Sequence, residues 1–251
     1  MCPSLSITIC NYNMKQTLPQ AFDSARNQEG VDVEILLIDD ASTDGSWEYI
    51  KTLTSLRNVR VLRNNHREGV VRCRARLLSE SRGEFMSVLD ADDLHTPEKA
   101  NRHCALLQAN PGAGVICGRA VLVETGKANL VYPPDGFQPT LDLVDPYYVV
   151  HSATTWRKSA LLDVGGYDLS LTCEECVDLF FKIGDRWGQI FDLSLSAVKR
   201  VDASGEFRLF WNQNVARVSK NIMLRTLTRR YGLNKGSLYR RLSPLQASER
   251  T

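Results

Sequence analysis

Long apolar runs, a strong net charge and a leader-like amino terminus are all missing from this 251-residue chain. No apolar stretch approaches the roughly 20 residues that a membrane-spanning helix needs. The first residues run directly into an apolar strand, so we expect no signal peptide. The formal net charge of +2 is too small to indicate a nucleic-acid partner by itself. We therefore expect a cytoplasmic protein, soluble or peripheral on the inner face of a membrane, that binds no nucleic acid.

A disulfide framework is not indicated either. The 7 cysteines are an odd number and are scattered along the chain, which fits reduced thiols better than paired ones. Cys173 and Cys176 form a Cys-x-x-Cys pattern, but both intervening residues are glutamates and no second cysteine pair completes a zinc site. The pattern alone does not establish a redox pair.

The first half of the chain alternates between strand and helix patterns. The hydrophobic share of the whole chain, 43%, suffices for one large domain or two closely packed lobes. The expected strands cover residues 5–10, 33–38, 59–62 and 85–89. The expected helices cover residues 16–27, 47–56, 70–81 and 97–109. This rhythm predicts a parallel sheet flanked by helices, with the functional loops after the strands.

The second half is less regular. It predicts a strand at 115–124, a proline-rich loop at 131–146, a short helix at 156–164, a longer helix at 174–187 and a closing strand at 190–200. From Glu206 the tail reads as helical, and from Arg217 onward it carries nine Lys or Arg against one acid, Glu249. A basic helix of this kind either lies on an anionic membrane surface or packs on the domain.

Three carboxylates follow the fourth expected strand within four positions, at Asp90, Asp92 and Asp93. In α/β proteins, ligands bind beyond the carboxyl ends of the strands. Hard oxygen ligands at such a place suit Mg²⁺ or Mn²⁺ bound together with a phosphorylated substrate. We therefore expect Asp90 and Asp92 to bind a metal. The alternative is a solvated turn that caps the next helix.

Four motifs share one order along the chain. They read Ser-Ile-Thr-Ile-Cys-Asn-Tyr-Asn at 6–13, Ile-Asp-Asp-Ala-Ser-Thr-Asp-Gly at 38–45, Arg-Gly-Glu-Phe-Met-Ser-Val-Leu-Asp-Ala-Asp-Asp at 82–93 and Gly-Gly-Tyr-Asp at 165–168. Together they resemble the family 2 glycosyltransferases, which act in polysaccharide biosynthesis. The resemblance implies an α/β GT-A domain, with a Rossmann-like, mostly parallel sheet flanked by helices and a C-terminal helical tail. It implies a nucleotide-sugar-binding half at 1–110, an acceptor-binding half of the same domain at 111–205 and the basic tail at 206–251.

The resemblance also implies a nucleotide site, made of Cys10, Tyr12, Asp39, Asp40, Arg74, Asp90 and Ala91. Tyr12 would stack on the base, and Asp40, supported by Asp39, would accept a hydrogen bond from a uracil-type imide. Arg74 would contact the nucleotide. Arg72 and Arg76 are its neighbours, although only one face of their helix can point at the site, and a solvated helix face is the alternative for all three.

The catalytic base is less clearly marked. Similar enzymes carry a Glu-Asp pair after a Gly-Gly-Phe-Asp turn, whereas this chain reads Leu-Thr-Cys-Glu-Glu-Cys-Val-Asp-Leu at 171–179. The family's Asp falls on Cys176 in one alignment and on Glu175 in the other. Because a thiol is a poor base, we expect Glu175 to act, with Glu174 and Asp178 as alternatives. These acids could instead only complement the helix dipole.

Several further residues lie near the expected site. His95 follows the acidic cluster and either approaches the metal or phosphates or sits in a helix-capping turn. His151 would line the sugar pocket, whereas Trp156 is expected in the core. Asp202 or Lys199 would contact phosphate where the family has a histidine-containing loop.

These features predict an inverting glycosyltransferase of the hexosyl- or N-acetylhexosaminyltransferase type. It would move a sugar from a nucleotide-sugar, in the first place a UDP-sugar, to a glycan or lipid-linked acceptor, with Mn²⁺ or Mg²⁺ bound. A nucleotidyltransferase would need a glycine-rich phosphate loop after the first strand, which residues 11–13 do not provide. Because Cys176 falls at the position of the family's Asp in one alignment, a catalytically degenerate module that only binds nucleotide-sugars remains an alternative.

Overall fold

The computed structural model describes residues 4–123, 130–133, 149–200, 222 and 225–226. The chain divides into two compact units, Met1–Ser204 and Gly205–Thr251, and the first unit carries the fold and the site. Nearly all of the basic tail, most of the proline-rich loop and Asp202 lie outside the described residues, so the expectations for them stay predictions. No helix in the described part is long and apolar enough to cross a bilayer.

A parallel sheet forms the first half of this unit. Its strands are β1 (Leu5–Asn11), β2 (Val33–Asp39), β3 (Val59–Arg63) and β4 (Phe85–Asp90). They lie in the order β3-β2-β1-β4, and all neighbours pair in parallel. The register sets Asn11 opposite Asp39 and Cys10 opposite Asp90. The predicted alternation is therefore confirmed, and the candidate residues at the strand ends share one edge of the sheet.

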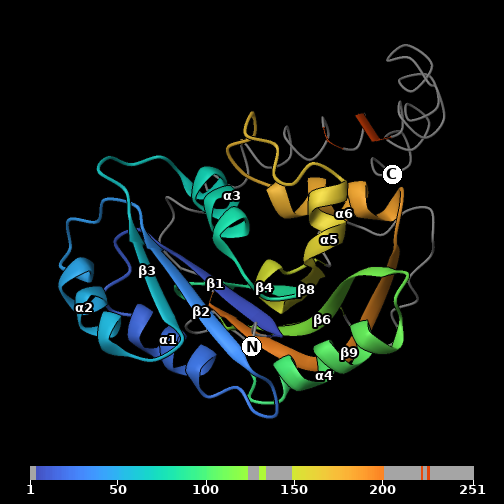
Figure 1. The fold of residues 1–251 in the computed structure, drawn as a ribbon, viewed down its shortest axis with the longest axis horizontal. Coiled ribbons are helices and arrows are strands. Elements are labelled where there is room, and N and C mark those ends of the chain that lie inside the picture. The colour runs from blue at the N-terminus through green and yellow to red at the C-terminus, as the bar shows by residue number, and fades with distance from the viewer. Residues whose placement is uncertain (1–3, 124–129, 134–148, 201–221, 223–224, 227–251) are drawn as a thin grey trace, which may run out of the picture. The chain divides into compact units, whose positions relative to one another are not determined.

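Helices cover both faces of the sheet (Figure 1). One face carries α1 (Leu18–Arg26), α2 (Ser46–Thr52, continued by the 3-10 helix Leu53–Ser55) and α4 (Lys99–Ala109). The other carries α3 (Val70–Glu80), α5 (Lys158–Asp163) and α6 (Glu175–Gly184). Strand β4 serves both cores, because Phe85 and Leu89 face the first set of helices while Met86 and Val88 face the second, as the two-residue period of a strand requires.

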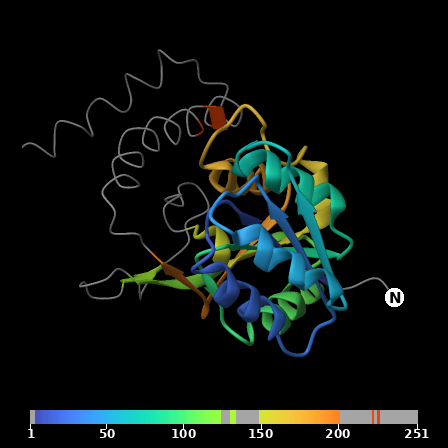
Figure 2. The ribbon, with the colours of Figure 1, turned by 90° about the vertical axis from the view of Figure 1, so that its left-hand side faces the viewer.

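The second half of the sheet is mixed rather than parallel. Its strands are β5 (Leu94–His95), β6 (Ala113–Val123), β7 (Leu130–Tyr132), β8 (Thr154–Arg157) and β9 (Gly188–Arg200). The order continues β4-β8-β6-β9-β5, with β7 on β6. Strand β8 is antiparallel to both β4 and β6, whereas β6 and β9 run parallel, side by side (Figure 2).

One expectation for this half is wrong, and two short strands were missed. The segment at 156–164 is not one helix, because Trp156 belongs to strand β8 and the helix begins only at Lys158. Two threonines and a tryptophan in succession favour a strand, and Trp156 is fully buried in the core, as expected. The short strands β5 and β7 were also not predicted, since two or three residues are too few to show a period.

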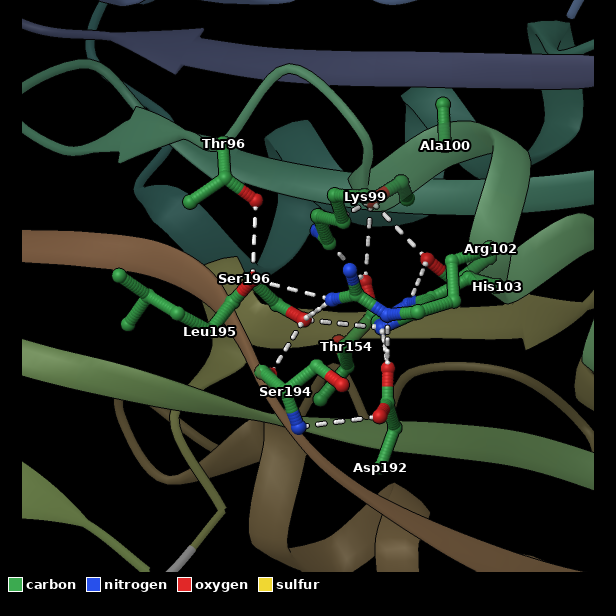
Figure 3. A network of polar contacts seen from close by, with 12 residues as sticks. Thr96, Lys99, Ala100, Arg102, His103, Thr154, Asp192, Ser194, Leu195 and Ser196 are labelled. Atoms are coloured by element: carbon green, nitrogen blue, oxygen red, sulfur yellow. Dashed lines mark hydrogen bonds and ion pairs between the residues drawn. The ribbon is translucent and has the colours of Figure 1, made fainter. Parts of the chain in front are cut away.

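Helix α4 is tied to strand β9 by a polar network (Figure 3). The Arg102 guanidinium pairs with Asp192 and donates to the Leu195 carbonyl and to Ser196 Oγ, both at 3.0 Å. His103 Nε2 lies 3.0 Å from the same hydroxyl. Burial lowers the pKa of His103 to about 4, so its imidazole is neutral at pH 7. The network fixes β9, whose last residues reach the acidic turn.

Candidate active site

The acidic turn after β4 gathers its three carboxylates. The Asp93 N–H donates to the Asp90 carbonyl at 3.0 Å, which closes the turn. One carboxylate oxygen each from Asp90, Asp92 and Asp93 lie within 4.8 Å of one another. Clustered hard oxygens of this kind fit Mg²⁺ or Mn²⁺. The two expected metal ligands therefore lie together, with the buried backbone of Ala91 between them.

Asp90 and Asp92 differ in their partners. Asp90 Oδ1 pairs with Arg74, and Lys199 Nζ lies 3.6 Å from Asp90 Oδ2. Burial opposes ionisation of Asp90, but these two cations outweigh it and hold the pKa of Asp90 well below its usual range. Asp92 has no ion-pair partner among the described residues, and burial together with the Asp90 charge raises its pKa. Asp92 is therefore the carboxylate of the cluster that is left for an added cation.

Asp93 is fully buried and held from several sides. Its Oδ2 accepts from Ser152 Oγ at 2.6 Å and lies 3.4 Å from Lys199 Nζ, and its Oδ1 accepts from the Arg200 N–H at 3.0 Å. Burial and the neighbouring carboxylates raise the pKa of Asp93 to about 7 despite Lys199. Ser152 Oγ also accepts from the Asp90 N–H at 3.1 Å. This serine, which the sequence did not indicate, joins both ends of the turn.

Arg74 bridges the acidic turn to the expected catalytic base. Its buried guanidinium pairs with Asp90 through Nη2 and with Glu175 through Nη1. Glu175 is the first residue of α6 and is itself buried, and His151 Nδ1 lies 3.8 Å from its Oε1. Residues that lie about one hundred positions apart in the sequence thus form one cluster.

The other candidates on or beside helices α3 and α6 differ from Arg74 and Glu175 in their surroundings. Asp178 pairs with Lys182 on its own helix at 2.6 Å. Burial raises the pKa of Cys176 to about 12, so its thiol stays neutral. Glu174 precedes α6 with a left-handed φ of 61°. Arg72 and Arg76 are exposed, as the helical geometry required.

The residues expected to bind the base of the nucleotide also stabilise the loops around them. Asp40 accepts from Asn64 Nδ2 at 2.8 Å, from the Glu68 N–H at 2.9 Å and from the Gly69 N–H at 2.8 Å. Burial opposes its ionisation, but these hydrogen bonds lower the pKa of Asp40. Asp40 thereby anchors the loop that opens α3, where Gly69 has a φ of 91°, a conformation that glycine adopts at low cost.

The first loop is fixed in a similar way. Asp39 accepts from Asn11 Nδ2 at 2.9 Å and from the Ser42 N–H at 3.2 Å. The Tyr12 ring is half-buried and lies under the Arg67 guanidinium, 4.1 Å from its carbon. A hydrogen bond with Cys73 raises the pKa of the Cys10 thiol, and burial adds to this effect. The six nucleotide-site candidates in the first 90 residues therefore surround one edge of the sheet.

The expectations for His95 are wrong. It neither approaches the acidic cluster nor caps a helix, because the pairing of β5 with β9 buries it. Its Nε2 lies 3.1 Å from the Val88 carbonyl and 2.8 Å from Lys99 Nζ. Lys99 is also buried and donates to the Ser152 carbonyl at 2.7 Å. A lysine in the first turn of a helix gives no sequence signal of this role, since such residues are usually solvated.

Comparison with known proteins identifies the family. The protein-family model described as "Glycosyl transferase family 2" matches residues 6–149. The UDP-Glc:alpha-D-GlcNAc-diphosphoundecaprenol beta-1,3-glucosyltransferase WfaP of Escherichia coli is 24% identical over 198 residues, which cover 60% of this chain and 78% of that protein. Seven other curated relatives are matched over 27% to 61% of their own length.

Two groups of solved structures share the fold. S. aureus TarS 1-349 in complex with UDP-GlcNAc aligns with a TM-score of 0.69 at 16% identity, over 94% of this chain and 75% of that chain. The mannosyltransferase PcManGT from Pyrobaculum calidifontis, in complex with GDP-Man and Mn²⁺, aligns with a TM-score of 0.68 at 16% identity, over 94% and 66%. These likenesses show the GT-A fold alone, whereas the family model covers more than half of the chain. The chain is therefore a member of glycosyl transferase family 2, and an enzyme of the glycosyltransferase class.

Proposed function

We propose that this enzyme moves a sugar from a nucleotide-sugar, specifically a UDP-sugar, to a glycan or lipid-linked acceptor, with inversion at the anomeric carbon and with Mn²⁺ or Mg²⁺ bound. The observation that carries the proposal is the bridge formed by Arg74, which joins Asp90 at the expected diphosphate side to Glu175. Residues 1–110 would bind the donor and residues 111–205 the acceptor. Membrane contact of the basic tail belongs to the same proposal.

The donor and acceptor classes are supported by the relatives. The E. coli relative uses UDP-Glc and a GlcNAc-diphosphoundecaprenol acceptor by its name, and TarS was solved with UDP-GlcNAc. PcManGT was solved with GDP-Man, so a guanine nucleotide is the competing donor. Asp40, an acceptor of hydrogen bonds beside the Tyr12 loop, is compatible with the N–H of a uracil base.

The metal would be held by Asp90 and Asp92. When bound, such an ion neutralises the charge that develops on the diphosphate leaving group. Asp92 supports this assignment because its carboxylate pairs with no described cation. Arg74 and Lys199 already lie at Asp90, so the chain supplies two further positive charges toward the diphosphate side.

We assign the role of general base to Glu175. An acceptor hydroxyl that attacks the anomeric carbon must lose its proton to a nearby base. The Glu175 carboxylate pairs with Arg74, which links it to Asp90 at the expected diphosphate side. The neutral thiol of Cys176 cannot take this role, and Asp178 pairs with Lys182 and not with Arg74, which links Glu175 to Asp90.

The test is Glu175→Gln, measured as UDP-GlcNAc and UDP-Glc hydrolysis with Mn²⁺ and as UDP binding by calorimetry. We expect turnover to fall by about 10²-fold or more while UDP affinity changes less than about twofold, because the amide oxygen of glutamine can still accept a hydrogen bond from Arg74. Asp178→Asn on the same helix is the matched control and should retain turnover. Wild-type turnover in the Glu175→Gln variant would contradict the assignment, and a wild-type chain that binds these donors without turning them over would favour a binding module.

A further inference from the structure

Lys199 extends from the end of β9 into the acidic turn. Strand β9 pairs with β5, with Val198 opposite Leu94, so the next residue reaches the carboxylates that precede β5. Lys199 Nζ lies 3.4 Å from Asp93 Oδ2 and 3.6 Å from Asp90 Oδ2. Its position is set by the strand, which the polar network with α4 holds in place (Figure 3).

The two oxygens of Asp90 are not equally available to a metal ion. Oδ1 pairs with Arg74, which is buried and also bound to Glu175, so it is committed to that bridge. Oδ2 is the remaining oxygen, and it faces Lys199. A divalent cation bound at about 2.1 Å from Oδ2 would lie close to the lysine ammonium, and like charges at that distance repel.

The cluster nevertheless keeps unbalanced negative charge. Asp90 and Asp93 form ion pairs with Arg74 or Lys199, whereas Asp92 forms none with a described residue, and Arg74 is shared with Glu175. The cluster therefore still attracts a cation, while Lys199 reduces that attraction.

We propose that Lys199 competes with the divalent cation for Asp90 and thereby couples cation binding to nucleotide binding. The inference rests on the proposed function. Without nucleotide, the ammonium stays on Asp90 and Asp93 and weakens cation binding. A bound diphosphate offers Lys199 a new anionic partner, so the cation then binds Asp90 more tightly. Cation and nucleotide must raise each other's affinity by the same factor, because the coupling free energy is reciprocal.

The experiment is a Mn²⁺ titration, with free Mn²⁺ followed by electron paramagnetic resonance, in the presence and absence of UDP. Lys199→Met keeps the side-chain length and removes the charge. In the absence of UDP, we expect this variant to bind Mn²⁺ about tenfold more tightly than the wild-type chain, which is the effect of one partly screened charge. UDP should then increase its Mn²⁺ affinity by a smaller factor than in the wild type. Lys199→Arg, which keeps the charge, and Lys182→Met, which removes an ion-paired lysine of α6, should both behave like the wild type.

Thermal unfolding separates competition from a merely structural role. Lys199→Met should melt below the wild type without Mn²⁺, because Asp90 and Asp93 lose a counter-ion, and should recover when Mn²⁺ is added. Unchanged or weaker Mn²⁺ binding, or a melting deficit that Mn²⁺ does not reduce, would overturn the inference. Donor turnover by the wild-type chain tests the proposed function separately. If the wild-type chain shows no turnover but Lys199→Met binds Mn²⁺ more tightly as expected, the proposed function alone is contradicted. If the wild-type chain turns donors over but Lys199→Met binds Mn²⁺ with unaltered affinity, this inference alone is contradicted.

Discussion

Ser152 is the residue on which the geometry of the acidic turn depends most directly. Its hydroxyl donates to Asp93 at 2.6 Å and accepts from the Asp90 N–H at 3.1 Å. Its carbonyl accepts from Lys99. The side chain is fully buried, so water cannot replace a lost partner. A single hydroxyl thus connects the two ends of a turn that concentrates negative charge.

We predict that Ser152→Ala lowers the free energy of unfolding by about 1–3 kcal/mol, the cost of buried polar groups left without partners. It should also weaken Mn²⁺ binding several-fold, since Asp90 and Asp93 lose their common anchor. Chemical denaturation and Mn²⁺ titration provide the two readouts. Ser170→Ala is the matched control, because Ser170 is exposed and, in the part of the chain that the structure describes, its hydroxyl donates to the nearby Asp168. Equal behaviour of the two variants would contradict this role.

Individual residues were predictable where a local motif contained them. Asp90, Asp92 and Asp40 follow strands in recognisable segments, and the structure brings their loops to one edge of the sheet. The contacts between Arg74 and Glu175, or between Ser152 and Asp93, join segments far apart in the chain, and no periodic pattern encodes such pairs. The catalytic role of Glu175 stays a prediction, although the structure does bring it to Arg74.

At the scale of elements, the strands and helices of the first half were predictable because their patterns are local and long. Strand β2 contains an unbroken apolar run at 35–38, and helix α1 buries four apolar residues at helical spacing. The end of strand β8, at Trp156, was mistaken for the start of a helix because four residues show no clear period, and its place is decided by pairing with β4 and β6. The same holds for β5, whose two residues pair with β9. Tertiary pairing, which the sequence does not display, decides such elements.

At the scale of the whole molecule, buried histidines make stability depend on pH. Burial lowers the pKa of His95, His103 and His151 below the ordinary value near 6.5. Below pH 6.5 the unfolded chain binds protons at these sites while the folded chain does not, so stability falls as the pH drops toward 4. Asp93 acts in the opposite direction, because its folded pKa of about 7 lets the folded state retain a proton that the unfolded state releases.

We predict that His103→Gln reduces this acid sensitivity. With a folded pKa of about 4, His103 accounts for about one proton taken up on unfolding at pH 5.5. The measurement is the pH dependence of the unfolding free energy between pH 5 and 7.5, by urea denaturation, in both proteins. The slope near pH 5.5 should fall by about 1.4 kcal/mol per pH unit in the variant. An unchanged slope would mean that His103 is protonated in the folded state.

The central claim is that carboxylates at the end of β4 hold a divalent cation against the diphosphate of a nucleotide-sugar. The most direct measurement is the UDP dissociation constant by calorimetry, with and without Mn²⁺, in the wild-type chain, in Asp92→Asn and in the control Asp23→Asn, whose aspartate is exposed on α1. Asp92 has no ion-pair partner in the described structure, so its substitution should leave the fold intact. We predict that Mn²⁺ tightens UDP binding about tenfold or more in the wild type and the control, and not in Asp92→Asn. Equal tightening in all three proteins would contradict the account.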